Sequence, residues 1–238
     1  MTERIGPEQL TAEQQAFPRI LLFEFHNSTD DSGRHVAELE LLDVWPNAFP
    51  DGPVELTDGR IQGFRLPSKV GQLLTDNSVK DDGYRFHDAL HIGVMAGVGW
   101  SPVMRSLLGI KRRADARVDE IDDGGRSIVL EESLFDYLGM KHIEFGNSIE
   151  QDISLSFAVS AVKYAIEERG TGVDRLPRDE LTHALLEGAK LFHEVRRNLG
   201  GYALANLDNR TAMYIPKDPD TYISPQQALL QALEESQG

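Results

Sequence analysis

The chain has 238 residues and a formal net charge of −15, with 40% apolar and 26% charged residues. This composition is ordinary for a globular protein of one large domain, and no apolar run of the sequence is long enough to span a bilayer. The acidic balance argues against an extended nucleic-acid surface, and the absence of cysteine excludes disulfides and thiolate metal sites.

The N-terminal part is expected to be extended or irregular. Residues 1–18 form a polar arm without a basic leader or an apolar core, so we expect a cytoplasmic protein. The apolar run 19–25 and the alternating run 36–41 indicate two strands, and the turn-forming residues between them predict a hairpin. Four prolines and three glycines between 43 and 67 indicate irregular chain, with one short strand at 62–66.

From residue 68 onward the pattern changes to that of helices. Ser68 is a candidate cap for a short helix ending at Leu74, and the dipeptide Ser101-Pro102 is a clear helix start because it places Ser at the cap and Pro at the first position. Helices are predicted over 84–97, 101–113, 126–138, 148–168 and 179–198. A tight-turn hairpin is predicted over 202–215, followed by a tail and a helix at 226–235.

These elements predict a mainly α fold, a helical bundle with a small N-terminal β element and a C-terminal β-hairpin. We expect residues 1–67 to form a β and irregular segment packed on the core. Residues 68–215 would be the helical domain with its hairpin, and residues 216–238 would be a tail with a terminal helix.

Two segments place titratable side chains among apolar ones. His87, Asp88 and His91 share one helix face because they are three and four residues apart, and Glu131 and Glu132 directly follow an apolar run about forty residues later. The alternative is a buried His that bonds to a backbone carbonyl, beside carboxylates that only face solvent. A groove between two helices that supply Asp88 and Glu132 would hold a divalent ion, which bridges phosphate oxygens and activates water.

Six short motifs of the chain have a specific order and spacing. They are residues 74–77, 82–91, 99–103, 111–112, 119–126 and 128–132, and a helix with a Gly-Gly hairpin follows at 198–215. Together they resemble the helical region that accompanies or extends MazG-like nucleotide pyrophosphohydrolases, over roughly residues 70–215. The resemblance implies an all-α enzyme that cleaves NTP or dNTP to NMP and pyrophosphate with Mg²⁺ or Mn²⁺.

The resemblance also implies the roles of individual residues. Glu131, Glu132 and Asp88 would be catalytic, and these three with His91 and His87 would be the metal ligands. The usual MazG core carries a Glu-Glu-x-x-Glu helix, whereas here Ser133, Leu134 and Phe135 follow the glutamate pair. The chain therefore either uses a variant ligand set or has the fold without the activity.

Cations in the same stretch are candidates for binding the substrate phosphates. Arg85, Lys111, Arg112 and Arg126 would neutralise a triphosphate and Tyr84 would stack on the base. The alternative for each cation is a surface ion pair, and the alternative for Tyr84 is a core anchor. The basic cluster at 111–113 also suits a solvated helix C-terminus.

Two other functions are consistent with the same residues. One is a non-catalytic module of the same fold for nucleotide sensing or protein interaction. The other is an HD-type metal phosphohydrolase, suggested by the adjacent His87 and Asp88, for which His142 and His183 are the candidate additional ligands. We expect the protein to bind a small-molecule nucleotide and not a membrane. The resemblance also implies that the chain forms a homodimer or a higher homo-oligomer.

Overall fold

The computed structural model describes residues 17–45, 54–55, 61–62, 68–111, 120, 122–145 and 176–217. Its centre is a five-stranded antiparallel sheet with the strand order β5-β2-β1-β6-β7. The strands are β1 (Ile20–Thr29), β2 (His35–Trp45), β5 (Ser68–Thr75), β6 (Gly201–Asn206) and β7 (Thr211–Ile215). A separate two-stranded ladder joins β3 (Val54–Glu55) and β4 (Ile61–Gln62).

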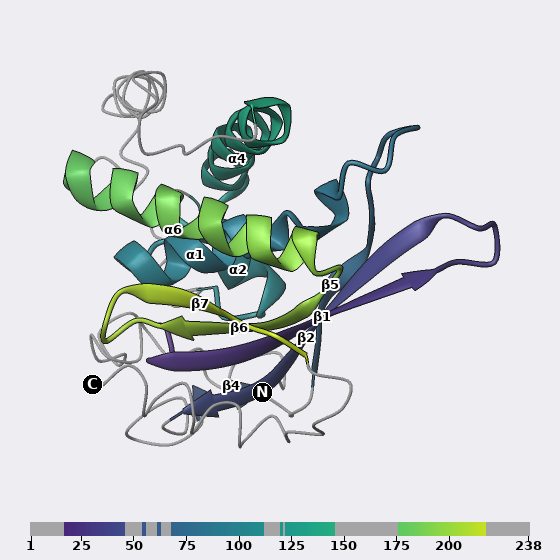
Figure 1. Cartoon of the computed structure of the whole chain (residues 1–238). Helices are drawn as coiled ribbons and strands as arrows, with labels where there is room; N and C mark the ends of the chain where they lie inside the picture. The colour runs from purple at the N-terminus through teal and green to yellow at the C-terminus, as the bar shows by residue number, and fades with distance from the viewer. Residues whose placement is uncertain are drawn as a thin grey trace.

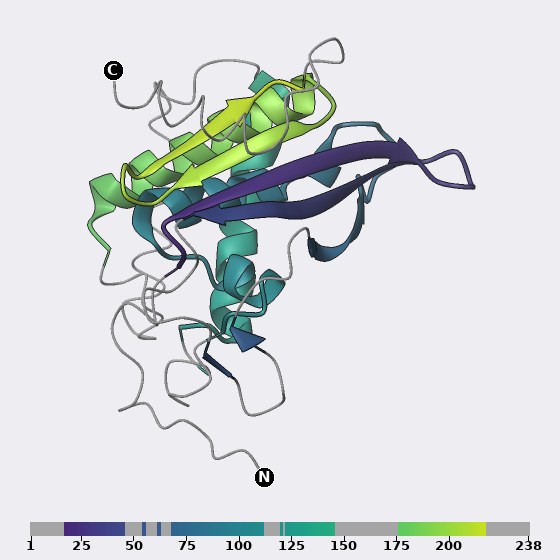
Figure 2. The same ribbon diagram turned by 90° about the horizontal axis from the view of Figure 1, so that it is seen from below.

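Helices cover one face of this sheet (Figures 1 and 2). The 3₁₀ turn η2 (Tyr84–Phe86) leads into α1 (Asp88–Val98), and α2 (Pro102–Leu107) follows. The long helix α6 (Arg178–Arg197) lies beside α1. Helix α4 (Gly125–Phe145) contacts α1, α2 and α6 on the side away from the sheet (Figure 1). Within the described part of the chain, no helix combines the length and apolar character that a membrane crossing requires.

The prediction of a mainly α helical bundle is wrong. The two predicted hairpins exist, but β1 of the first pairs with β6 of the second, from Ile20 opposite Asn206 to Phe25 opposite Gly201, so both belong to one sheet. The fold is therefore α+β and not all-α. Hydrophobic periodicity identifies single strands but not their partners, and these two strands lie near opposite ends of the chain.

A second error concerns residues 68–74, which were expected to form a helix. They form the edge strand β5, in which Val70 lies opposite Leu39 of β2. Gly71 has a φ of 71° at an irregularity of the ladder, a backbone conformation that glycine adopts without steric penalty. A run of seven residues is too short to distinguish the two-residue period of a strand from the period of about 3.6 residues of a helix, which explains the error.

The other described helices overlap the predicted segments with shifted ends, and the helix predicted over 101–113 is shorter than expected because α2 ends at Leu107. The predicted helix at 84–97 is divided at His87 into η2 and α1, and Gly99 caps its end with a φ of 64°. The oxygen of Ser101 accepts a hydrogen bond from the N–H of Met104 at 3.0 Å, as expected of a cap. Helix α4 continues past Gly139 to Phe145, and the helices predicted at 148–168 and 226–235 lie outside the described residues.

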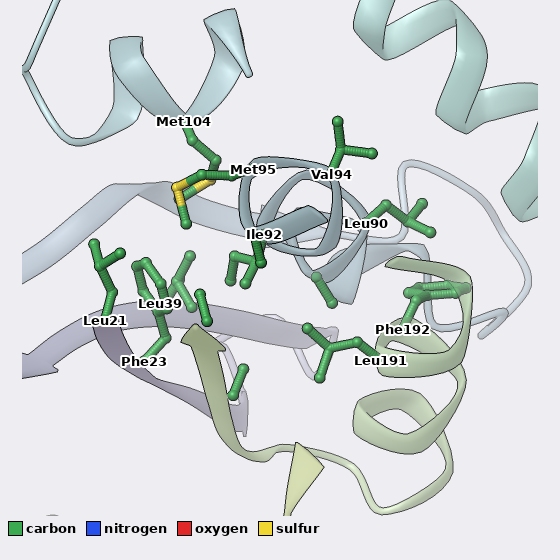
Figure 3. Close-up of a cluster of buried hydrophobic side chains, with 14 of the residues drawn as sticks. Leu21, Phe23, Leu39, Leu90, Ile92, Val94, Met95, Met104, Leu191 and Phe192 are labelled. Atoms are coloured by element: carbon green, nitrogen blue, oxygen red, sulfur yellow. The ribbon is translucent and has the colours of Figure 1, made fainter. Parts of the chain in front are cut away.

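The main core lies between the sheet and the helices. In Figure 3, α1 is seen between strand residues Leu21, Phe23 and Leu39 and the α6 residues Leu191 and Phe192. Every α1 residue from Asp88 to Gly97 is buried, so polar side chains on this helix are held inside the protein. That placement explains why the titratable residues of α1 require buried partners.

The packing of α1 on α6 is close because both helices carry glycine at the contact. A Cβ added at Gly93 would lie 2.1 Å from the Cα of Gly188, and one added at Gly97 would lie 2.6 Å from the Cβ of Ala184. The backbones thus approach without intervening side chains. This contact sets the position of α1, and with it the candidate site.

Candidate metal centre

The two predicted segments meet in the structure. His91 of α1 and Glu131 of α4 are fully buried, and His91 Nδ1 lies 2.9 Å from Glu131 Oε1. The second ring nitrogen, Nε2, lies 3.6 Å from Glu132 Oε2, which is longer than a hydrogen bond. Among the described residues, His91 Nε2 is one of two buried side-chain atoms without a hydrogen-bond partner.

Three side chains on or just before α1 form the centre of the site. One ligand atom each from His87, Asp88 and His91 lies within 4.8 Å of the others. His87 Nε2 is 3.7 Å from Asp88 Oδ1, and Nδ1 of the same ring is 3.0 Å from the carbonyl of Tyr84. The expected convergence of these three residues on one face is therefore present, and Glu132 reaches the same place from α4.

The glutamate pair is divided into two environments. Glu131 Oε1 accepts a hydrogen bond from Ser101 Oγ at 2.7 Å as well as contacting His91, and its Oε2 accepts from the N–H of Val103 at 3.0 Å. Glu132, by contrast, has a side chain that is 38% exposed. Glu131 is thus enclosed by donors, whereas Glu132 lies at the edge of the site.

The electrostatics of the site follow from burial and from these contacts. Burial raises the pKa of Asp88, because removing the carboxylate from water disfavours its charge. Burial alone lowers the pKa of His91, but the carboxylates of Glu131 and Glu132 together outweigh this effect and raise the pKa to about 10. The contact with His91 lowers the pKa of Glu132.

The donor set fits a divalent ion. Asp88 is a buried carboxylate whose side chain is 6% exposed, and its Oδ1 lies 3.7 Å from His87 Nε2. A buried carboxylate beside an unpartnered imidazole nitrogen is costly unless a cation compensates both. His87, Asp88 and His91 would hold that ion, with Glu132 at the edge.

The sequence did not indicate how Glu131 is held. Ser101 was recognised as a helix cap, but its hydroxyl also donates to Glu131, and the N–H of Val103 completes the contact. The ring of Phe135 packs edge-on against His91, with centroids 4.6 Å apart. The only sequence signal was the Ser-Pro start of α2, which predicts a free N–H group near Val103.

Arg85, predicted to bind substrate phosphates, lies in a different environment. Its side chain is 1% exposed, and its Nη1 is 2.7 Å from Asp76 Oδ2 and 2.6 Å from Asp81 Oδ1. Its Nε donates to Asn27 Oδ1 at 3.0 Å. These contacts join η2 to β1 and to the loop between β5 and η2, so they give Arg85 a structural role.

The remaining predicted substrate residues are less constrained. Tyr84 stacks on His87, with centroids 4.5 Å apart and an interplanar angle of 8°. Lys111 is half-buried after α2 and Arg126 is exposed in the first turn of α4, whereas Arg112 lies outside the described residues. His183, a candidate HD-type ligand, is exposed on α6, and the side chain of His142 lies outside the described ones.

A second group with ligand-like spacing lies on the sheet. Glu24 and His26 of β1 and Glu40 of β2 form it, and His26 Nε2 is 3.3 Å from Glu40 Oε2. Lys217 already bonds to Glu24, so an amine neutralises the most buried carboxylate of this group. The α1 group is therefore the stronger candidate for a metal.

Comparison with known proteins supports the resemblance found in the motifs. The family described as the MazG C-terminal domain matches residues 58–218. Neither the comparison with curated proteins nor that with solved structures gives a match. The matched region includes β5, every described helix and the β6–β7 hairpin, and hence the whole α1 site. The chain belongs to the MazG C-terminal domain family.

Proposed function

We propose that the chain is a metal-dependent, MazG-like nucleotide pyrophosphohydrolase that cleaves an NTP or dNTP to the NMP and pyrophosphate. Family membership supports the nucleotide class of substrate. The observation that carries the proposal is the buried, unpartnered Nε2 of His91 beside Asp88, His87 and Glu132. These groups converge from two helices, as residues of a metal site do.

The chemistry adds one water across the phosphoanhydride bond between the α- and β-phosphates. When bound, a divalent ion polarises phosphoryl oxygens and offsets the charge that develops on them. Asp88, His87 and His91 would hold this ion. We assign Glu132 to orient the attacking water, because it is ionised and half-exposed at the edge of the group.

Glu131 has another role in this proposal. Its oxygens are engaged by His91, Ser101 and the N–H of Val103, so it positions the imidazole and does not contact substrate. Lys111 and Arg126 are proposed to bind the phosphates. We further propose that the protein acts in the cytoplasm. We also propose that it forms a homodimer or a larger homo-oligomer, and light scattering of the purified protein tests this oligomeric state.

The second candidate is a nucleotide-sensing module without turnover. The enclosure of Glu131, one of the carboxylates expected to act in catalysis, is the observation that favours it. Calorimetry that detects nucleotide binding without any released pyrophosphate would support this alternative. The HD-type hypothesis loses support, because His183 is exposed on α6 and does not join the described ligand group.

The test is pyrophosphate release from a panel of NTPs and dNTPs with Mg²⁺ or Mn²⁺. We expect Asp88→Asn and Glu132→Gln to lower kcat by about 100-fold or more, the range for groups that act on the transition state. Glu40→Gln is the matched control, because it removes a carboxylate from the other histidine–carboxylate group. Full activity in both Asp88→Asn and Glu132→Gln would remove the assignment.

A further inference from the structure

The polar atoms around His91 form an incomplete set. His91 is 0% exposed, yet its Nε2 has no hydrogen-bond partner among the residues that the structure describes. Asp88 is buried, and its Oδ1 lies 3.7 Å from His87 Nε2, which is longer than a hydrogen bond. Such groups destabilise a folded chain unless something bridges them. A divalent cation can replace the proton on the imidazole nitrogen, and the nitrogen and a carboxylate oxygen of Asp88 would then each donate an electron pair to it.

We propose that His87, Asp88 and His91, with Glu132 at the edge, bind one divalent transition-metal ion of the Mn²⁺ to Zn²⁺ series in preference to Mg²⁺. In the same proposal, Glu131 is a positioning residue for His91 and not a ligand. This deepens the metal part of the proposed function by naming the class of ion. It does not require hydrolysis, because the ion binds before any substrate.

The preference for a transition metal follows from the donor atoms. Mg²⁺ is bound almost entirely by oxygen and retains its waters, whereas imidazole suits Mn²⁺, Fe²⁺, Co²⁺ and Zn²⁺. Two of the three grouped residues, His87 and His91, offer nitrogen. The absence of cysteine from the chain leaves histidine and carboxylate as the ligands.

The positioning role of Glu131 follows from its contacts. Its carboxylate lies 2.9 Å from His91 Nδ1, and Ser101 Oγ and the Val103 N–H hold it in place. A metal-binding histidine commonly donates its other N–H to a carboxylate, which fixes the ring orientation and tautomer. Nδ1–H therefore points to Glu131, and Nε2 lies 3.6 Å from Glu132 Oε2.

The competing interpretation is a closed ion pair. An imidazolium at His91 between Glu131 and Glu132 would satisfy the charges without any metal. That interpretation leaves Asp88 buried without a bridging cation and assigns no role to His87. The two interpretations differ in whether the intact chain binds a metal and which side chains the binding needs.

The experiment uses the full chain after dialysis against a chelator. Mn²⁺ binding is followed by the loss of the free-ion EPR signal, Co²⁺ binding by visible absorption, and Mg²⁺ by its competition with Mn²⁺. We expect one Mn²⁺ per chain and at least about 10-fold weaker binding of Mg²⁺, with a Co²⁺ spectrum that reports nitrogen ligation. No Mn²⁺ or Co²⁺ binding, or tighter binding of Mg²⁺, overturns the proposal.

Variants then locate the site. Asp88→Asn and His87→Gln should abolish or strongly weaken Mn²⁺ binding, and Glu131→Gln should weaken it about 10–100-fold, as for other carboxylates that orient a histidine ligand. Glu40→Gln, in the β1–β2 group, should bind as the wild type does. Unchanged binding in both Asp88→Asn and His87→Gln, or loss of binding in Glu40→Gln, overturns the site.

Circular dichroism of each variant excludes unfolding as the cause. If a variant does not fold, the stoichiometry, Co²⁺ spectrum and Mg²⁺ competition of the wild type still decide whether this class of ion binds. Metal binding at these residues without pyrophosphate release would refute the proposed reaction and leave this inference intact.

Discussion

His91 Nδ1 and Glu131 Oε1 lie 2.9 Å apart in a contact between α1 and α4 in which neither side chain is exposed. The contact joins two segments that lie forty residues apart in the sequence. It ties the packing of α4 to the orientation of the imidazole. Stability and the orientation of the imidazole are therefore coupled through one pair of residues.

Replacing one member of this pair should destabilise the fold. We expect Glu131→Gln to lower the free energy of unfolding of the metal-free protein by about 3–5 kcal/mol, because it leaves a buried charge without its partner. Glu132→Gln should cost less than about 1 kcal/mol, since that side chain is 38% exposed. Urea denaturation measures both, and equal losses would contradict the different environments of the two glutamates.

The glycine contact between α1 and α6 predicts a packing defect. Gly93→Ala should destabilise the chain by at least about 2 kcal/mol, because the new Cβ would lie 2.1 Å from the Cα of Gly188. Gly125→Ala is the control, since no atom of the described residues lies within 4 Å of its added Cβ, and its effect should stay below about 1 kcal/mol. Thermal denaturation compares the two variants. If Gly93→Ala is as stable as the wild type, α1 and α6 lie farther apart than in this structure.

The buried ion pair of Arg85 makes a third prediction. Arg85→Met should cost about 3–5 kcal/mol in unfolding free energy, because it leaves Asp76, which is 8% exposed, without its cation. Arg210→Ala removes an exposed pair with Glu180 of 2.8 Å and should cost less than about 1 kcal/mol. If Arg85 instead bound phosphate, Arg85→Met would weaken nucleotide binding with little loss of stability.

The hairpin between β1 and β2 predicts an acid-resistant carboxylate. Hydrogen bonds from the Ser32 hydroxyl and the Arg34 backbone N–H hold the pKa of Asp30 well below its usual value. When folding lowers the pKa of a carboxyl group, the group stabilises the fold at pH values above its pKa in the unfolded chain. This stabilisation is lost as the pH falls through the pKa of the group in the folded chain. We expect Asp30 to remain ionised in a ¹³C carboxyl NMR titration well below pH 3.8.

The Ser32→Ala variant is the check on this prediction. It removes the hydroxyl that lies 2.6 Å from Asp30 Oδ1, so the titration midpoint of Asp30 should rise. A wild-type midpoint at the usual aspartate value would show that the turn does not hold the carboxylate as described.

Much of the local structure could be predicted from the sequence. The hairpins, the Ser101-Pro102 start of α2 and the position of α6 followed from turn residues, caps and apolar spacing, which act within a few residues. The metal candidates on α1 followed in the same way, because residues three and four apart on a helix always share a face. Local geometry alone placed His87, Asp88 and His91 together.

What the sequence could not supply were contacts between distant segments. The pairing of β1 with β6, which makes the fold α+β, depends on which strands meet in the folded chain. The distinction between Glu131 and Glu132 has the same origin, since adjacent residues on α4 point in different directions and only the packing against Ser101 and Val103 buries one of them. Sequence spacing alone therefore placed the candidate residues of α1 together, and tertiary packing decided that Glu131 is buried against His91 while Glu132 remains partly exposed.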